Sequence, residues 1–351
     1  MMSRIAPMMC RIAYLLVVLA VLVACQEQPR QEAIAFNNDV LLPITPVKDQ
    51  RNSDLCWAYA MLATIETEHI VQGDSVNLSA DFVARHLLRE LTIDSYLRRH
   101  NRPISLRGMA PRLINRIMKD GLLSYDSYHS NECNYRVLQR KLTNMAHVAA
   151  NRRISRAQFA QKVEQTLDDE IRPVPRYQFM YGAEYTTREF AHSVCLPDEY
   201  VALTSYTHRP FGQHMVLDVP DNTDGDAFLN LPMDSLLTLV EQSVSGGHPV
   251  CWEGDISEPG FDFAAGLAVT NEHPSQQLRQ QQFETKGTTD DHCMSIVGLA
   301  TDKQGRRYFI CKNSWGKDNP YNGLVYMSFD YFFLKTIAVV LPKNQLAAIS
   351  L

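Results

Sequence analysis

Little in this sequence is typical of a membrane-spanning or nucleic-acid-binding protein. After the first 25 residues, no apolar run approaches the ~20 residues that a helix needs to cross a bilayer. Basic side chains are not in excess, since the whole chain carries a net charge of −5, which argues against a nucleic-acid surface. Internal repeats and low-complexity segments are also absent. At roughly 150 residues per domain, the 351 residues predict about two compact units, either domains or lobes.

The cysteines do not form a metal-binding or redox pattern. There are eight, irregularly spaced and without a CxxC pair, which argues against zinc and thioredoxin-like sites. Cys251 and Cys311 lie in apolar runs where a thiol usually fills core, so most cysteines are expected to be structural and reduced. His208 and His214 have no third ligand at a usable spacing. We therefore expect no metal and no cofactor.

The first 24 residues have the features of a secretion signal. Arg4 and Arg11 precede an apolar run, and a small residue precedes Cys25. Leu22-Val23-Ala24-Cys25 resembles the bacterial lipobox, in which the signal is cut before a cysteine that then carries the lipid. An ordinary signal peptide or an anchor helix is the alternative. We expect residues 25–40 to be a tether and Cys25 to anchor the chain to a membrane of the bacterial cell envelope, on its periplasmic or surface face.

The rest of the chain changes character from helical to strand-forming. Helices are expected from Ser53 or Asp54 as cap to about Val71, then in "LSADFVARHLLREL", "MAPRLINRIMKDG" and about residues 134–170. Short runs rich in β-formers follow: "MVLDV", "PVCWEGD", "CMSIVGLA", "RRYFICKN" and "GLVYMSF". One helix, about residues 234–245, lies between the first two runs. Helices first and strands later predict an α+β fold whose site lies between a helical lobe and a sheet lobe.

Four residues in these segments could carry acyl-transfer chemistry. Cys56 begins a helix, where the helix dipole lowers a thiol pKa. His292 begins one apolar strand and Asn313 ends the next, so the amide could orient the imidazole. Gln50 could donate a hydrogen bond to an oxyanion, together with the backbone N–H of Cys56. Each signal is weak alone, but their order and spacing together favour a nucleophile over a buried core thiol.

These segments resemble the papain-like cysteine peptidases. "PVKDQRNSDLCWAYAMLATIE" resembles the nucleophile segment of that superfamily, "RGMAPRLINRIMKDGLLSYDSY" its cleft wall, and "DHCMSIVG" with "YFICKNSWG" its histidine and asparagine strands. The resemblance implies that Gln50, Cys56, His292 and Asn313 are the catalytic residues. It also implies that Trp315 shields the His–Asn hydrogen bond and that Trp315 and Gly108 border the substrate cleft.

Spacing indicates one branch of this superfamily. His292 and Asn313 follow Cys56 by 236 and 257 positions, against about 130 to 150 in papains and cathepsins. An insertion must therefore separate the lobes, and its order resembles the bleomycin hydrolase and aminopeptidase C branch. We expect a two-lobed peptidase domain over residues 41–351, with a mainly helical insertion at about 131–200. Relatives in this branch form hexamers, so an oligomer is one outcome that the resemblance allows.

The sequence departs from that branch at several points. Leu55 replaces a small residue before the nucleophile, and Asp54 stands where a carboxylate would oppose thiolate formation. Branch members continue into a C-terminal arm that fills the cleft, whereas this sequence stops at Leu351, so an open cleft that accepts blocked amino termini is expected. Glu253 and Asp255 are interpreted as solvated loop carboxylates rather than contacts for a substrate amine.

A cysteine peptidase acting on peptides or proteins is therefore the predicted function. Two alternatives stay open. One is a non-catalytic peptide-binding lipoprotein that has kept the cleft. The other is an acyl transferase or amidase that uses the same triad on an amine acceptor or a cell-wall peptide.

Overall fold

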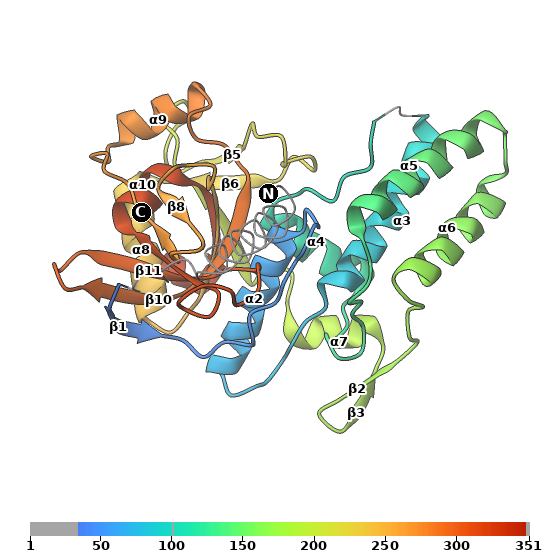
Figure 1. Ribbon diagram of the computed structural model, residues 1–351, viewed down its shortest axis with the longest axis horizontal. Coiled ribbons are helices and arrows are strands. Elements are labelled where there is room, and N and C mark those ends of the chain that lie inside the picture. The colour runs from blue at the N-terminus through green and yellow to red at the C-terminus, as the bar shows by residue number, and fades with distance from the viewer. Residues whose placement is uncertain (1–33, 100–101, 349–351) are drawn as a thin grey trace, which may run out of the picture. The chain divides into compact units, whose positions relative to one another are not determined.

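The computed structural model describes residues 34–99 and 102–348, within a compact unit that begins at Ala35. Figure 1 shows the helices of residues 80–194 mainly on one side of this unit and most strands on the other, together with the helices of residues 233–335. The predicted α+β class with a helical and a sheet lobe is thus confirmed. Cys25 and the expected signal segment lie outside the described residues.

The helical lobe is built on α2 (Cys56–Val71), α3 (Ala80–Arg98) and α4 (Ala110–Asp120). Gly121 ends α4 with a φ of 86°, a left-handed conformation that glycine adopts without strain. The sequence suggested one apolar face for α2, but eleven of its residues are buried, so it is a central helix covered on most sides. The expected cap was wrong: Leu55 occupies the N-cap without a side-chain hydrogen bond, because the Ser53 hydroxyl instead bonds to Gln50 O at 2.7 Å.

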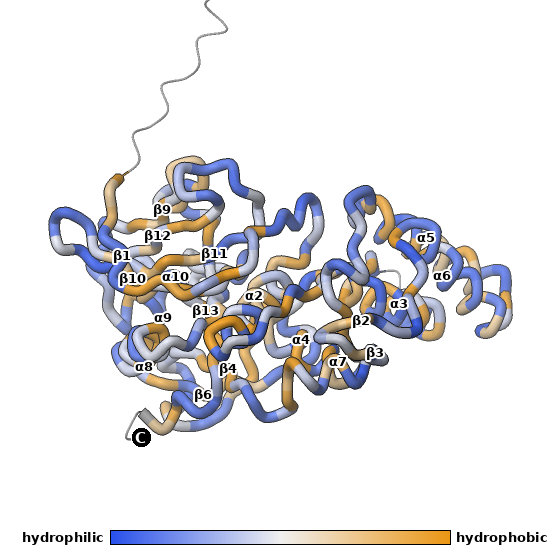
Figure 2. The backbone as a smooth tube through the Cα atoms, turned by 90° about the horizontal axis from the view of Figure 1, so that it is seen from below, coloured by the Kyte–Doolittle hydropathy of each residue, from blue (hydrophilic) through white to orange (hydrophobic). Residues whose placement is uncertain are grey.

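The expected helical insertion contains three helices and a small hairpin. Residues 134–170 form two helices separated by a turn, since Ser155 caps the second one by accepting a hydrogen bond from Gln158 N. Figures 1 and 2 both place α5 and α6 beside α3, away from the large sheet. The elements are α5 (Tyr135–Asn151), α6 (Arg156–Glu170), β2 (Gln178–Met180), β3 (Ala183–Tyr185) and α7 (Thr187–Val194).

One large sheet organises the other lobe. Its order is β5-β6-β4-β13-β7-β10-β11-β12-β9-β8. The strands are β4 (Tyr200–Thr204), β5 (His214–Val216), β6 (Ala227–Asn230), β7 (Val250–Gly254), β8 (Phe261–Asp262), β9 (Leu267–Ala268), β10 (His292–Asp302), β11 (Arg307–Lys312), β12 (Leu324–Ser328) and β13 (Thr336–Pro342). All five predicted strand runs are present, although "MVLDV" is extended only as far as Val216.

Part of the expected tether belongs to this sheet. Residues Phe36–Leu41 form β1, which pairs antiparallel with the distal half of β10. Phe36 stacks on Tyr326 with a 3.9 Å centroid separation and meets Tyr308 edge-on at 4.9 Å. This aromatic packing explains why residues Phe36–Leu41 form a strand, although the polar composition of the segment predicted a tether.

Two cores lie on opposite faces of the central strands. On one face α2 packs on β7 and β10, and the Thr64 and Ser295 hydroxyls meet there at 2.9 Å. On the other face Trp252 and Met294 join a second cluster with α8 (Met233–Ser245) and α10 (Phe329–Lys335). Figure 2 shows apolar stretches concentrated in these central strands. The remaining elements are α9 (Gln276–Glu284) and the 3₁₀ helix η1 (Lys343–Ala348).

Candidate active site

Cys56 is the first residue of α2, at the junction with the sheet lobe. The thiol belongs to a half-exposed side chain, whereas the five other cysteines of the described residues are buried and all six are free thiols. A hydrogen bond from Cys293 lowers the pKa of Cys56 well below its usual value; His292 and the backbone N–H of Trp57 act in the same direction and outweigh burial. The sequence expectation of an activated thiol at a helix start agrees with this geometry.

His292 and Asn313 meet at the ends of neighbouring strands. The imidazole Nε2 lies 2.8 Å from Asn313 Oδ1, so Nε2 is the nitrogen that donates and Nδ1 is left for other contacts. Both side chains are buried. The Trp315 ring lies 4.7 Å from the imidazole, and Phe263 packs edge-on against Trp315 at 5.3 Å. Trp315 thus packs beside the histidine–asparagine contact, and its role in shielding that contact from water stays a prediction.

Gln50 is held by Ser53 and Ser314. Its Nε2 donates to Ser53 O at 2.9 Å, and its Oε1 accepts from Ser314 Oγ at 2.6 Å. Its backbone N–H also donates to Ser314 O at 2.8 Å. Because a primary amide carries two N–H donors, one hydrogen remains for an oxyanion beside the first-turn amide of Cys56, which has no intrahelical acceptor.

Cys293 is a site residue that sequence reasoning missed. It was placed among structural thiols because it lies in an apolar strand, yet its side chain hydrogen-bonds Cys56. Its position in the sequence gave no signal for this role, because successive strand residues point to opposite faces and the sequence does not show which face α2 covers. Burial raises the pKa of Cys293 well above normal, with Cys56 adding to the effect. It is therefore the protonated donor of the pair.

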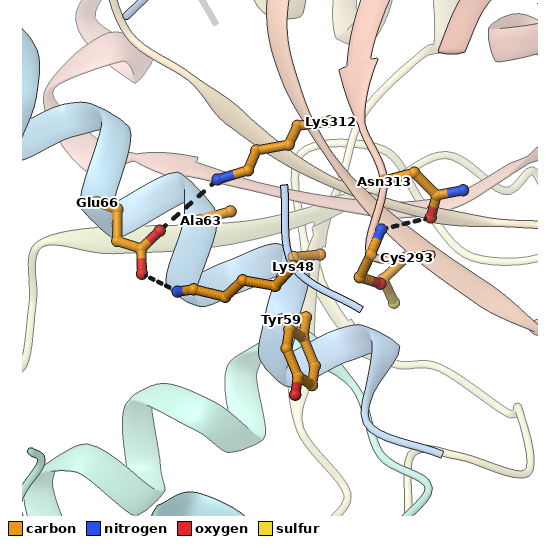
Figure 3. A pocket seen from close by; sticks show the side chains of 9 residues that line it. Lys48, Tyr59, Ala63, Glu66, Cys293, Lys312 and Asn313 are labelled. Atoms are coloured by element: carbon orange, nitrogen blue, oxygen red, sulfur yellow. Dashed lines mark hydrogen bonds and ion pairs between the residues drawn. The ribbon is translucent and has the colours of Figure 1, made fainter. Parts of the chain in front are cut away.

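A buried ion network lies behind the site (Figure 3). Both lysines, Lys48 and Lys312, point at Glu66, with Nζ–carboxylate distances of 2.5 and 3.7 Å. Burial alone would raise the pKa of Glu66, but the two lysines outweigh it and lower it. Thr45 also donates to Glu66 at 2.5 Å. The network ties the segment leading to Gln50 to α2 and to the strand that ends at Asn313.

Gly108 lies where a side chain has no room. A Cβ there would come 2.9 Å from the Arg112 side chain and 3.1 Å from the Trp57 ring. The Trp57 indole N–H donates to Leu106 O at 2.8 Å, which fixes this segment beside the nucleophile. The glycine is thus explained by close packing on Trp57, and its expected contact with substrate backbone stays a prediction.

Glu253 on β7 and Asp255 just after this strand are not in the environment that the sequence predicted. Glu253 and Asp255 are each 2% exposed, so the interpretation as solvated carboxylates was wrong. Asp255 is structural, because it accepts from Ser257 N at 2.8 Å and from Thr289 N at 2.6 Å. Neither oxygen of Glu253 has a hydrogen-bond donor within the part of the chain that the structure describes. The charge on Asp54 raises the pKa of both Arg107 and Asp221, whose side chains pair at 2.7 Å.

Metal and membrane features were also sought in residues 34–99 and 102–348. No group of three or more histidine, cysteine, aspartate or glutamate side chains there could hold a metal ion. None of the helices in the same residues is both long and apolar enough to cross a membrane.

Comparison with known proteins connects this geometry with a family. Residues 176–350 match the family model described as Peptidase C1-like family. The second half of the chain is thus similar to this peptidase family. Aminopeptidase G of Lactobacillus delbrueckii subsp. lactis is 27% identical over 160 residues, which are 42% of this chain and 36% of that protein. The mitochondrial Cysteine proteinase 1 of Saccharomyces cerevisiae (strain YJM789) is 23% identical, covering 90% of this chain and 78% of the yeast protein.

A solved structure extends the C1-like assignment to the fold of both lobes. The PepW structure from Lactobacillus rhamnosis HN001 matches with a TM-score of 0.67 at 16% identity, over 89% of this chain and 83% of that one. The expected papain-like fold is therefore confirmed. The predicted similarity to cysteine peptidases and aminopeptidases is confirmed. The match covers only about a third of the length of Aminopeptidase G, so the activity of the whole chain is a proposal.

Proposed function

We propose that this protein hydrolyses peptide bonds with Cys56 as nucleophile, His292 as acid and base, Asn313 as the group that orients it, and Gln50 as oxyanion donor. One observation carries the proposal: the thiol with a strongly lowered pKa stands at a helix start beside His292, whose Nε2 is fixed by Asn313 at 2.8 Å. A protein that only binds peptides would not need these four groups in this arrangement. Catalysis needs all of them.

The first half of the reaction forms a thioester. The Cys56 thiolate adds to the scissile carbonyl carbon, and the negative charge that develops on oxygen is stabilised by the Gln50 amide and the Cys56 backbone N–H. As the tetrahedral intermediate collapses, the C–N bond breaks and the protonated His292 delivers its proton to the leaving amine. The imidazolium can do this because its other nitrogen stays bonded to Asn313.

The second half releases the acid. His292, now neutral, removes a proton from water as the water oxygen adds to the thioester carbonyl. Collapse of the second tetrahedral intermediate breaks the C–S bond and regenerates the Cys56 thiolate beside the imidazolium. Trp315 and Phe263 cover the histidine–asparagine bond throughout, which preserves the orientation of the ring.

Two other functions use the same cleft and are distinguished by the products. An acyl transferase or amidase would form the same thioester but pass the acyl group to an amine or act on a cell-wall peptide. A non-catalytic peptide-binding lipoprotein would bind peptides and release them unchanged. The lowered pKa of Cys56 favours the catalytic functions over the binding one.

A peptide library with free and acetylated amino termini, analysed by mass spectrometry, tests the proposal. Wild type should give new carboxyl termini, and Cys56→Ala should give none, while Cys311→Ala, at a buried thiol of the sheet core, serves as the control. Cleavage of the acetylated members would identify an endopeptidase, whereas trimming of the free-amine members alone would identify an aminopeptidase. Amide products that appear only with added amines would instead identify a transferase.

Location is proposed from the first residues alone. A lipid on Cys25 would hold the protein at a membrane of the bacterial envelope through acyl chains. Cys25→Ser should move the protein out of the detergent phase, and a version starting at Gln26 should stay in the aqueous phase. Membrane association of that shorter version would show that another surface anchors it.

A further inference from the structure

Glu253 is a buried carboxyl group aimed at the nucleophile side of the sheet. Its strand partner in the β7–β10 register is Cys293, and directly opposed residues share a face. Cys293 contacts Cys56, so Glu253 lies on the face that α2 covers. It is 2% exposed, and neither oxygen has a donor within the described residues. A buried polar group without a partner is costly, and it calls for an explanation.

Asp290 is a second such group beside it. The main chain joins them, since Asp291 N donates to Gly254 O at 3.3 Å. Asp290 is 7% exposed, and its Oδ2 has no donor in the described part of the chain. Burial, Asp221 and the charge on Cys56 raise the pKa of Asp290 to about 8. Burial, Asp290 and Cys56 raise that of Glu253 well above normal. Both carboxyls therefore lie close to the nucleophile and to each other.

The nearby cation is already engaged elsewhere. Arg107 Nε donates to both carboxylate oxygens of Asp221, at 2.7 and 3.0 Å. Its Nη2 donates at 3.1 Å to the main-chain carbonyl of Asp290, not to the carboxyl group. The Arg107 guanidinium thus neutralises the charge of Asp221, while Glu253 and Asp290 are two further acids nearby. Arg107 also lowers the pKa of Asp290, but burial and Asp221 outweigh it, and within the described residues neither Glu253 nor Asp290 forms an ion pair.

A cavity borders the Arg107–Asp221 ion pair. It has a volume of about 560 Å³ and is lined from the helical lobe by Ser105, Arg107 and Arg112 and from the sheet lobe by Pro220, Asp221 and Thr223. Glu253 and Asp290 do not themselves line the cavity; Arg107 links them to it, because its side chain borders the cavity and donates to the main-chain carbonyl of Asp290. The charge on Cys56 raises the pKa of both acids, so the pair also lies near the nucleophile.

We propose that Glu253 and Asp290 form a cation subsite, which binds a positively charged group of the substrate next to the scissile bond. This inference rests on the proposed peptidase function and adds a substrate class to it. Without substrate, the two carboxyls hold a proton, because adjacent buried carboxylates repel each other. A bound cation replaces that proton as the countercharge and supplies the missing hydrogen-bond donors.

Two sources offer the same cationic chemistry. One is a free α-ammonium group at the amino terminus of the substrate. The other is a lysine or arginine side chain within a longer peptide. The first would make the protein trim amino termini, and the second would make it cleave beside basic residues. Both place an N–H donor between the two carboxyl groups.

Matched fluorogenic substrates separate these sources. One arm compares Ala-Ala-aminomethylcoumarin with its acetylated form, and the other compares acetyl-Arg-Ala-aminomethylcoumarin with the uncharged citrulline analogue. The variants are Glu253→Gln and Asp290→Asn, with Glu241→Gln as the control, a carboxylate that pairs with Arg307 at 2.7 Å. Thermal melting verifies folding, and if one variant fails to fold the other decides.

The readout is the ratio of kcat/KM between the charged and uncharged member of each arm. Wild type should prefer the charged member in at least one arm by roughly 10- to 100-fold, the range of one buried charge-assisted hydrogen bond. Either site variant should reduce that ratio to about threefold or less, while Glu241→Gln keeps it. No preference in either arm, or a preference that survives both site variants, overturns the subsite.

Calorimetric binding to Cys56→Ala tests the subsite independently of the peptidase activity. If wild type hydrolyses none of the four substrates, the proposed function fails, and binding alone decides the subsite. Tighter binding of a charged member, with proton release from the acid pair and loss of the preference in Glu253→Gln, supports it. Equal binding of charged and uncharged members overturns it.

Discussion

The imidazole Nε2 of His292 lies 2.8 Å from Oδ1 of Asn313, although the two residues come from different strands. Asn313→Ala removes this acceptor, so the ring can rotate away from Cys56. Since small misplacements of a catalytic group are expensive, we expect kcat to fall up to about 100-fold. Asn313→Asp keeps an acceptor and should retain more activity than the alanine variant. Wild-type kinetics in Asn313→Ala would remove Asn313 from the site.

Loss of Gln50 should affect the transition state more than substrate binding. One oxyanion donor is typically worth about 2.7 to 4 kcal/mol, or roughly 10²- to 10³-fold in kcat. Gln50→Ala should therefore lower kcat with little change in KM. Ser314→Ala removes the hydroxyl that holds Gln50 Oε1 at 2.6 Å and should give a smaller loss of the same kind. An effect on KM alone would reassign Gln50 to substrate contact.

The pH dependence of Cys56 alkylation tests the role of Cys293. Its hydrogen bond is the largest influence that lowers the pKa of Cys56, and the thiolate is the reactive form. In Cys293→Ala the pKa of Cys56 should rise, so alkylation by iodoacetamide should need higher pH than in wild type. Cys311→Ala, at a buried thiol of the sheet core, should leave the profile in place. Identical profiles for Cys293→Ala and wild type would contradict the role assigned to Cys293.

The sequence predicted that the proposed catalytic residues lie together better than it predicted their surroundings. Cys56, His292 and Asn313 stand at the ends of elements, where local patterns mark boundaries, and the structure brings all three together. The cross-strand pairing of Cys293 with Glu253 joins residues 40 positions apart, and that of β1 with β10 joins residues more than 250 positions apart. A single chain carries no local signal for such contacts.

Burial explains the errors of the sequence interpretation. "CWEGDISE" has the polar composition of a loop, and exposure was the expected environment of its carboxylates. The structure instead gives Asp255 a set of main-chain donors and leaves Glu253 without any in the described residues. Similarly, the spacing of apolar residues predicted one buried face for α2. Both lobes cover this helix, so it has no strongly polar face.

Stability should depend on the buried Glu66 network. Glu66→Gln leaves Lys48 and Lys312 without their shared carboxylate, and breaking a buried pair costs about 3–5 kcal/mol. Glu241→Gln, at a more exposed pair with Arg307, should cost at most about 1 kcal/mol. Urea unfolding at neutral pH measures both. Equal, small losses would show that the network does not stabilise the fold.

The Glu66 network also predicts how the free energy of unfolding changes with pH. Because the folded pKa of Glu66 lies below the usual value of 4.5, its stabilisation is present above that value and lost as pH falls through the folded pKa. The difference in unfolding free energy between wild type and Glu66→Gln should shrink over this acidic range. A difference that grows on acidification would contradict the assignment.

Identification of the first cysteine to react tests the central claim most directly. Limiting iodoacetamide near pH 6, followed by peptide mass spectrometry, ranks the thiols by reactivity. Cys56 should be labelled well ahead of Cys133, Cys195, Cys251, Cys293 and Cys311, and its labelling should abolish peptide hydrolysis in proportion. Comparable labelling of any buried thiol, or full activity after Cys56 is alkylated, would contradict the assignment of Cys56 as the nucleophile.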